Sequence, residues 1–408
     1  MSEWKKVELK DICEITSSKR IFFSEYVDIG IPFYRSKEII ELSNGQSISE
    51  PLFISETKYN DIRMKFGVPK ENDILLTSVG SIGIPYIVKK DDVFYFKDGN
   101  LTWLRNFKDF VFPTYLLYWL KSDETFNILN NIALGAAQKA LTIVKLKDVE
   151  ISLPPITTQY CIANILSRYD SLIENYQKQI NLLEEAAQRL YKEWFVDLHF
   201  PGHENTKIVD GVPEGWEKKK IADVCDTIGG GTPSTKVLSY YENGTISWVT
   251  PTDITRNNCL CLLSTEKKIT KEGLDHSSAK MLPAETILMT SRASVGYFGI
   301  CDFEVCTNQG FISCVPFDNR YQMYLLYNLM NRVEEIRIKA GGSTYLEISK
   351  SVFRNFDIIC PTDDLINKFQ QETHQLLERM RLICKQIRLL TEARDRLLPK
   401  LMSGEMAV

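Results

Sequence analysis

The chain has 408 residues, 44% of them hydrophobic and 25% charged, and a formal net charge of −4. This length and hydrophobic content predict more than one domain with substantial cores, and they exclude a disordered chain. The sequence pI of about 5.8 argues against a free-standing protein that holds nucleic acid by charge alone. It still allows a sequence-specific reader with local basic loops, assisted by a more basic partner.

The first residues, Met1-Ser-Glu-Trp-Lys-Lys6, contain no apolar segment of the kind that a signal peptide needs, and no run of 18 apolar residues occurs in the chain. We therefore expect a cytoplasmic protein. The 10 cysteines lie in apolar segments such as Asp11-Ile12-Cys13 and Asp223-Val224-Cys225, and no Cys-x-x-Cys pair is present. We expect free thiols that pack as small hydrophobic side chains.

The chain repeats itself from its start. The pattern at residues 4–13, with Trp, Lys, Leu, Asp and Cys at fixed spacing, returns at residues 216–225 with Ile221 in place of the Leu, an offset of 212. Each copy predicts an opening strand followed by a short helical turn. Next, residues 73–83 match residues 286–296, an offset of 213. In both, an apolar run breaks into Ser and Gly, which predicts a buried strand that delivers a loop of small residues.

The later parts of the two halves also match. Tyr115-Leu-Leu-Tyr118 returns as Tyr324-Leu-Leu-Tyr327, and each copy predicts the start of a helix that ends near Gly135 or Gly341. Both halves then reach a strand closed by proline, at residues 151–155 and 358–361, before a long helix begins. Offsets that stay between 205 and 213 predict one duplicated unit with small loop insertions.

The two long helices carry a coiled-coil pattern. Apolar residues recur at steps of four and three, the heptad spacing of a helix that packs along a narrow seam against another helix. Thr373 and Arg394 are the polar members of the second seam. The first seam comprises Ile162, Leu166, Tyr169, Ile173, Tyr176, Ile180, Leu183, Ala187, Leu190 and Trp194, and the second comprises Phe369, Thr373, Leu376, Met380, Ile383, Ile387, Leu390, Arg394, Leu397 and Leu401.

Charge favours pairing of these two helices with each other. Residues 160–197 include six acidic and four basic side chains, whereas residues 376–400 include three acidic and seven basic ones. Opposite net charges favour association of the two helices and disfavour pairing of either helix with a copy of itself. Two unrelated amphipathic helices on separate domains are the alternative interpretation.

Catalytic motifs are scarce. Gly229-Gly230-Gly231 is followed by Thr-Pro rather than by the Lys-Ser/Thr of a phosphate-binding loop, and His199 and His203 are separated by Pro-Gly, which breaks a helix. Cys259-x-Cys261 and Cys301-x4-Cys306 could supply half of a metal site, but their apolar neighbours favour core positions. No Gly-x-Ser-x-Gly elbow is present. We therefore expect a non-catalytic chain that binds no metal and no cofactor.

Loops with polar and basic residues remain as candidates for recognition. Arg and Lys read guanine edges or hold phosphates, and Asn and Gln pair with adenine. We select candidate DNA-binding residues by loop position and residue type. In the first half they are Lys19, Arg20, Arg35, Ser36, Lys37, Ser78, Gln138 and Lys139; in the second half they are Thr232, Ser234, Lys236, Ser291, Arg292, Asn308, Gln309, Ser343, Thr344 and Tyr345.

The order of these features resembles the specificity subunit of type I restriction-modification systems. Three segments carry the resemblance: Leu190-Tyr-Lys-Glu-Trp-Phe-Val-Asp-Leu-His-Phe-Pro-Gly202 at the end of the first helix, Val212-Pro-Glu-Gly-Trp216, and Leu397-Leu-Pro-Lys-Leu-Met-Ser-Gly-Glu-Met406. The resemblance covers nearly the whole chain. One departure concerns the loops: 17–20 reads Ser-Ser-Lys-Arg where 229–233 reads Gly-Gly-Gly-Thr-Pro, so no loop residue is carried from one half to the other.

The resemblance implies an α+β fold. It would contain two tandem mixed α/β target recognition domains separated by two long antiparallel coiled-coil helices, an internal duplication with pseudo-two-fold symmetry. The expected segments are target recognition domain 1 at 1–155, spacer helix 1 at 156–200, a linker at 201–215, target recognition domain 2 at 216–362, and spacer helix 2 with a tail at 363–408.

The resemblance also implies the function and the partners. Each recognition domain would read one half of a bipartite, asymmetric site in double-stranded DNA, and the helices would set the spacing and dock two modification (methyltransferase) subunits. Restriction subunits would join for translocation and cleavage. S-adenosylmethionine, ATP and Mg²⁺ are expected in the partner subunits. The alternatives are a coiled-coil scaffold whose end domains bind proteins without DNA specificity, and a self-contained nuclease or methyltransferase.

Overall fold

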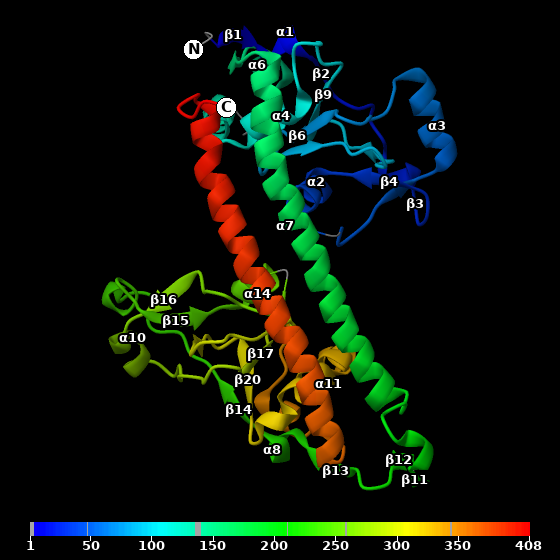
Figure 1. The fold of residues 1–408 in the computed structure, drawn as a ribbon, viewed down its shortest axis with the longest axis vertical. Coiled ribbons are helices and arrows are strands. Elements are labelled where there is room, and N and C mark those ends of the chain that lie inside the picture. Colours follow the sequence, from blue (N-terminus) through cyan, green and yellow to red (C-terminus); the bar gives the residue numbers. More distant parts are fainter. Residues whose placement is uncertain (1–3, 47, 135–139, 210, 258, 343–344) are drawn as a thin grey trace. The chain divides into compact units, whose positions relative to one another are not determined.

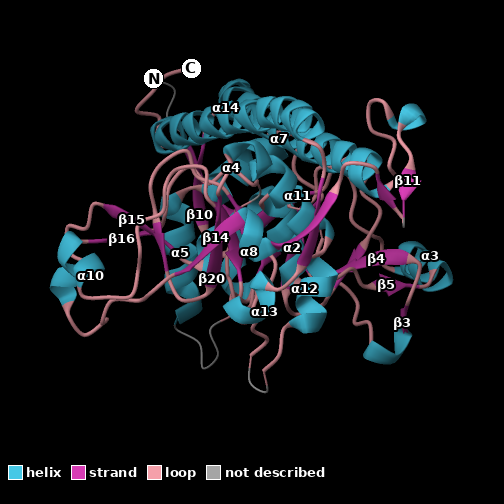
Figure 2. Ribbon diagram, turned by 90° about the horizontal axis from the view of Figure 1, so that it is seen from below, coloured by secondary structure: helices cyan, strands magenta, loops and turns pink. Residues whose placement is uncertain are grey.

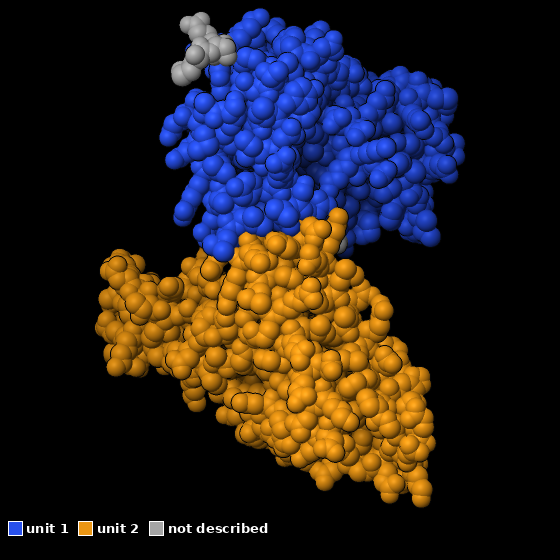
Figure 3. Space-filling model, in the orientation of Figure 1, with its two compact units in different colours: residues 1–174, 389–408 blue, residues 175–388 orange. Residues whose placement is uncertain are grey.

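The computed structural model describes residues 4–46, 48–134, 140–209, 211–257, 259–342 and 345–408. They form two compact units (Figure 3). Unit 1 comprises Met1–Glu174 and Leu389–Val408, and unit 2 comprises Asn175–Arg388. Each long helix therefore has one part in unit 1 and the other part in unit 2.

Unit 1 begins with a strand and a one-turn helix, as the sequence predicts, and then builds two four-stranded sheets, ordered β2-β9-β6-β7 and β3-β5-β4-β8. β1 pairs with β10 next to the start of α7. The elements are β1 (Lys5–Glu8), α1 (Leu9–Ile12), β2 (Glu14–Thr16), the 3-10 turn η1 (Phe23–Glu25), β3 (Tyr26–Val27), β4 (Ile31–Tyr34), α2 (Ser36–Ser43), β5 (Phe53–Ile54), α3 (Glu56–Lys65), β6 (Ile74–Thr77), β7 (Pro85–Ile87), β8 (Tyr95–Phe96), β9 (Leu101–Arg105), α4 (Pro113–Lys121), α5 (Asp123–Leu134), α6 (Ile143–Lys147), β10 (Glu150–Leu153) and α7 (Ile156–Tyr191).

Unit 2 repeats this plan, with sheets ordered β14-β20-β17-β18 and β16-β15-β19 and with β13 paired to β21. The duplication predicted from the sequence is therefore confirmed in the structure. The elements are the π-helical turn η2 (Lys192–Val196), η3 (His203–Asn205), β11 (Ile208–Val209), β12 (Val212–Pro213), β13 (Glu217–Lys220), α8 (Ile221–Val224), β14 (Cys225–Gly229), the 3-10 turn η4 (Leu238–Tyr240), β15 (Ile246–Val249), α9 (Pro251–Thr255), β16 (Lys267–Ile269), α10 (Lys271–Asp275), β17 (Ile287–Thr290), β18 (Phe298–Gly299), β19 (Cys306–Thr307), β20 (Phe311–Pro316), η5 (Asn319–Tyr321), α11 (Gln322–Asn331), α12 (Val333–Lys339), α13 (Lys350–Arg354), β21 (Asp357–Cys360) and α14 (Asp363–Met402).

The predicted apolar strands that deliver the small-residue loops are β6 and β17, which are inner strands of these sheets. All four residues of β6 and all four of β17 are buried, as expected for an apolar run between two other strands. The helix predicted after each tyrosine pair is instead two helices, α4 with α5 and α11 with α12. In unit 1 the break lies at Ser122, whose hydroxyl accepts a hydrogen bond from Thr125 N at 3.3 Å and so begins a new helix.

The two long helices run antiparallel in each unit, along one side of the sheets (Figures 1 and 2). In unit 1 the start of α7 meets the end of α14, where Arg394 Nη1 donates to Asp170 Oδ1 at 2.7 Å. In unit 2 the end of α7 meets the start of α14, where the rings of Tyr191 and Phe369 lie 6.1 Å apart. Every residue of both predicted seams is buried or half-buried, which confirms the heptad pattern. No helix among the described residues is both long and apolar enough to cross a membrane.

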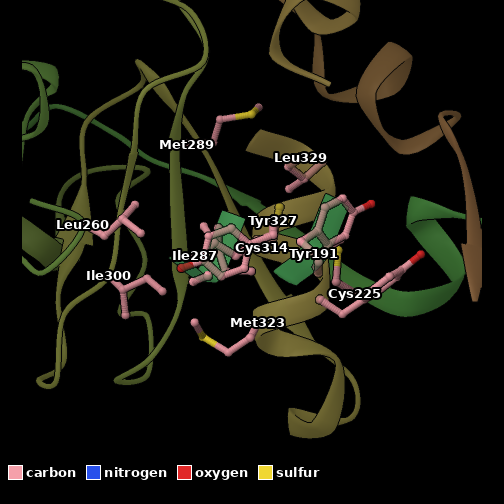
Figure 4. Close-up of a cluster of buried hydrophobic side chains, with 14 of the residues drawn as sticks. Tyr191, Cys225, Leu260, Ile287, Met289, Ile300, Cys314, Met323, Tyr327 and Leu329 are labelled. Atoms are coloured by element: carbon pink, nitrogen blue, oxygen red, sulfur yellow. The ribbon is translucent and has the colours of Figure 1, made fainter. Parts of the chain in front are cut away.

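The core of unit 2 shows how the helices hold a domain. Tyr191 of α7 packs among Cys225, Ile287 and Cys314 of the sheet and Tyr327 of α11 (Figure 4). Burial of large apolar side chains at about 25 cal/mol per Å² is the main stabilising contribution to such a core. Each long helix is thus part of a domain core as well as part of the coiled coil.

Candidate nucleic-acid interface

Three loops of unit 1 meet at one edge of the sheet β2-β9-β6-β7. The strand register places Thr16 of β2 and Thr77 of β6 beside the start of β9, so the loops that leave β2 and β6 lie next to the loop that enters β9. Ser17 Oγ donates to Leu101 O at 3.3 Å, and Ser78 N donates to Asn100 O at 2.8 Å. These bonds fix the three loops relative to one another.

A fourth segment joins the same edge. Leu141 N donates to Ser78 O at 2.8 Å, and Ala140 forms a β-bridge with Val79. The chain that follows α5 is therefore anchored on the small-residue loop after β6. We call residues 17–22, 78–84, 97–100 and 140–142 the reading edge of unit 1.

Unit 2 builds the same edge with other residues. Ser291 N donates to Gly310 O at 2.8 Å, Ile348 N donates to Ser291 O at 3.0 Å, and Gly231 N donates to Thr307 O at 2.9 Å. The reading edge of unit 2 comprises residues 230–237, 291–296, 308–310 and 345–348. The backbone scaffold is thus conserved between the two units while the exposed side chains differ.

The predicted residues of the first loop in unit 1 are exposed. Lys19 N donates to the hydroxyl of Tyr95 at 2.7 Å, and Lys19 Nζ lies 4.8 Å from the centre of the Phe66 ring. Arg20 Nε lies 2.9 Å from Asp98 Oδ2. Both cations are therefore held at the reading edge by their neighbours while their heads stay accessible to phosphate or base.

The predicted residues at the start of α2 are largely engaged within the protein. Arg35 N donates to Glu38 Oε2 at 2.6 Å and its guanidinium contacts the same buried carboxylate. Burial alone would raise the pKa of Glu38, but the hydrogen bonds from Arg35 hold that pKa below its usual value. Ser36 Oγ donates to Asn100 O at 3.3 Å, and Lys37 Nζ lies 3.0 Å from Glu50 Oε2. The Glu38 carboxylate therefore caps the start of α2 through Arg35 N, and the Arg35 guanidinium neutralises that carboxylate.

Ser78 and Ser291 lie at equivalent places, directly after β6 and β17, and anchor the neighbouring loops through backbone hydrogen bonds. Ser78 and Ser291 are both buried. Ser78 Oγ lies 2.6 Å from Thr102 Oγ1, with which it shares a hydrogen bond. Because both side chains are buried, these residues contribute to the reading edge through their backbone groups, which bond Asn100 and Leu141 in unit 1 and Gly310 and Ile348 in unit 2.

In unit 2 the predicted residues that the structure describes lie on all four segments of the reading edge. Thr232, Ser234 and Lys236 are exposed, and Thr232 Oγ1 donates to Gln309 Oε1. Arg292 is exposed, and its Nε lies 3.6 Å from Glu347 Oε2. Asn308 Oδ1 accepts from Gly310 N at 2.9 Å, and Tyr345 is exposed. Ser343 and Thr344 of the second half, and Gln138 and Lys139 of the first half, lie outside the described residues.

Asp98 and Asn100 were not among the sequence candidates, although both lie on the reading edge of unit 1. Their equivalents in unit 2 are Asn308 and Gly310, because Leu101 and Phe311 occupy matching places at the start of β9 and β20. The offset between these residues is 210, whereas it is 213 for the preceding strands, because the loops between the strands differ in length. An alignment of the two halves that starts from Leu101 and Phe311 would have matched Asp98 with Asn308 in the sequence.

The glycine run and the cysteines have structural roles. A Cβ at Gly231 would lie 2.4 Å from Ala279 N, so this glycine allows two segments to pack closely. All 10 cysteines are free, as predicted, and Cys261, Cys301 and Cys306 are buried in the cores. Among the described residues, no group of three or more His, Cys, Asp or Glu side chains is arranged to hold a metal ion.

Comparison with known proteins identifies the family and the fold. The family model for the type I restriction modification DNA specificity domain matches residues 1–185 and 213–388. The MjaIX type I restriction enzyme specificity subunit of Methanocaldococcus jannaschii is 28% identical over 100% of this chain and 94% of its own length. The HindI specificity subunit of Haemophilus influenzae is 24% identical over 100% of both chains. The crystal structure of an S subunit from M. genitalium superposes with a TM-score of 0.58 at 16% identity, over 98% of this chain and 96% of that one.

Proposed function

Because the chain belongs to the type I restriction modification DNA specificity family, we propose that each of its two units reads one half of a bipartite, asymmetric DNA target. The observation that carries this proposal is the reading edge, which is built twice on the same backbone scaffold with different side chains. A shared scaffold suits a shared task, and different side chains suit two different half-sites. Lys19 and Arg20 in unit 1, with Lys236 and Arg292 in unit 2, are the cations proposed to contact DNA.

The long helices are proposed to set the distance between the half-sites and to dock the partners. Leu182 of α7 and Leu389 of α14 occupy equivalent places in the repeat, and both are exposed. A large apolar residue that is exposed at the same place in both helices suits an interface with a partner helix. We propose that two modification subunits dock there, one on each helix.

Catalysis is proposed to reside in the partners. The modification subunits would bring S-adenosylmethionine and methylate adenine, and restriction subunits would bring ATP and Mg²⁺ for translocation and cleavage. The present chain would act in the cytoplasm as the non-catalytic subunit that selects the DNA. A scaffold without DNA specificity is the competing function, and it predicts the same assembly without any preferred methylation site.

The separate roles of the two units can be tested in the complex assembled with modification subunits. Arg292→Ala removes an exposed cation from unit 2, and we expect relaxed methylation at one half-site only, at about 1–3 kcal/mol if the arginine makes a bidentate base contact. Lys19→Ala should affect the other half-site. Lys267→Ala is the control, because Lys267 is exposed on β16 outside the reading edge. Methylation patterns that are identical in all three variants would contradict the assignment.

A further inference from the structure

An exposed apolar pair lies at the end of the first loop of the reading edge in both units. In unit 1 Phe22 directly precedes the 3-10 turn η1 and Phe23 begins it; their side chains are 61% and 86% exposed. In unit 2 Val237 directly precedes the 3-10 turn η4 and Leu238 begins it; their side chains are 36% and 66% exposed. Both turns lie between the strand that delivers the first loop and the second sheet.

The pair belongs to a repeated motif. Phe22-Phe23-Ser24-x-Tyr26 recurs as Val237-Leu238-Ser239-x-Tyr241, at an offset of 215. A single exposed hydrophobic residue on a surface is ordinary and needs no explanation. Two adjacent apolar residues that stay exposed at the same place in both copies, beside loops whose sequences have diverged, indicate a shared task.

Local contacts hold both turns in place. Phe22 N donates to Glu25 Oε2 at 2.8 Å, and Glu25 Oε1 lies 2.6 Å from Lys58 Nζ of α3. In unit 2 the hydroxyl of Tyr241 donates to Pro233 O at 2.6 Å. An apolar side chain on a fixed turn loses little conformational entropy when it enters a partner.

Cations beside the apolar pairs identify DNA as the partner. Lys19 and Arg20 precede Phe22 by two or three residues, and Lys236 directly precedes Val237; all three are exposed. An apolar side chain with adjacent cations fits the geometry of proteins that hold phosphates while they insert a wedge between stacked bases. Binding to a protein groove or to a lipid surface would not explain why the apolar pairs lie beside the loops that are proposed to read DNA.

We propose that Phe23 and Leu238 are wedges that enter a base step in the first and second half-site, respectively, and unstack it. This proposal rests on the proposed function and adds a mechanical role to base reading. The phenylalanine ring can stack on a base, whereas leucine can only separate two bases, so the distortion should be stronger in the half-site that unit 1 reads.

The test uses the complex with modification subunits and duplexes that carry its own target, taken from the methylated sites in cells. 2-Aminopurine replaces each adenine of both half-sites in turn, on either strand, except the adenine that is methylated, because a methyltransferase flips its target base out of the stack. With the wild-type chain, fluorescence should rise at one step in each half-site. Phe23→Ala should abolish the rise in the first half-site and weaken binding about tenfold, while Leu238→Ala should weaken binding about threefold. Phe23→Trp should restore both the signal and the affinity.

Two exposed phenylalanines serve as controls. Phe110 follows β9 and Phe317 follows β20, so both lie at the edge of their sheets opposite the reading edge. Phe110→Ala and Phe317→Ala should leave fluorescence and affinity unchanged. If the wild-type complex prefers its target but Phe23→Ala and Phe110→Ala give the same fluorescence and affinity, the wedge proposal is wrong and the proposed function still stands. Loss of modification subunits from Phe23→Ala, with unchanged binding by the complexes that remain, overturns it in favour of a protein contact. If the wild-type complex prefers no site, the proposed function falls and the wedge with it.

Discussion

Lys89 Nζ lies 3.3 Å from Glu174 Oε1, an ion pair between the globular part of unit 1 and helix α7. The equivalent positions in unit 2 are Asp302 and Arg381, with Asp302 Oδ2 3.9 Å from Arg381 Nε. The pair therefore has opposite polarity in the two copies. Lys89 faces an acidic residue of α7, and Asp302 faces a basic residue of α14. If the two helices exchanged places, each domain would face a like charge, which disfavours docking of a domain on the other domain's helix.

We predict unequal contributions to stability from these two pairs. Arg381 is only 6% exposed and also lies 2.7 Å from Glu285 Oε1, so Arg381→Met should destabilise unit 2 by roughly 1–3 kcal/mol. Lys89→Met should cost less than about 1 kcal/mol, because both partners in that pair are exposed. Thermal unfolding of the two variants measures the difference. Equal shifts in Tm would show that the buried position of Arg381 does not matter.

The seam gives a second prediction, with a control two residues away. Ile180 is buried in the core of unit 2, so Ile180→Asp places a carboxylate among apolar side chains and should cost about 3 kcal/mol or more. Leu182 is exposed on the same helix, and Leu182→Asp should change stability by less than about 0.5 kcal/mol. Under the proposed function, Leu182→Asp should instead weaken capture of a modification subunit. A folded Ile180→Asp protein with unchanged Tm would contradict the seam.

Glu184 gives a pH-dependent prediction. Its Oε1 accepts from Leu260 N at 2.8 Å, but burial raises the pKa of this carboxyl. A folded pKa above the unfolded value of about 4.3 means that the folded chain binds the proton more tightly, so stability falls as pH rises through the folded pKa and is level above it. Glu184→Gln keeps the acceptor and removes the charge. It should therefore raise Tm at pH 8 and lose that advantage near pH 4.

The neighbouring residue supplies the control for this measurement. Glu185 is exposed and pairs with Arg189 on the same helix. Glu185→Gln should show no gain in Tm at pH 8. A gain of the same size in both variants would mean that net charge, and not the burial of Glu184, sets the effect.

Helix length gives the fourth prediction, which rests on the proposed function. Seven residues inserted at matching points near Glu185 and Glu392 preserve the heptad phase and add about 10 Å to each helix at ~1.5 Å per residue. The methylated motif should keep both half-sites and gain a spacer longer by about three base pairs, at ~3.4 Å each. An active complex that still methylates the original spacing would show that another part of the chain sets the distance.

The sequence predicted the duplication, the buried central strands and the seams, because each depends on periodic burial that a pattern of apolar residues records. Residue type alone did not show what a candidate side chain touches inside the protein. Arg35 stays a predicted DNA contact, but the structure adds that Glu38, three residues later, pairs with its side chain and caps α2. The sequence analysis predicted one continuous helix across Ser122, because a single serine is common inside a helix. The structure shows that the Ser122 hydroxyl caps a second helix at this point.

The most direct test of two-domain DNA reading is co-expression of this chain with its cognate modification subunit, followed by mapping of methylated adenines across the host genome. We expect one motif with two specific half-sites separated by a non-specific spacer of fixed length. Arg292→Ala and Lys19→Ala should each degrade a different half-site of that motif. Assembly of the complex with no methylated motif, or with a motif that lacks a spacer, would contradict the account.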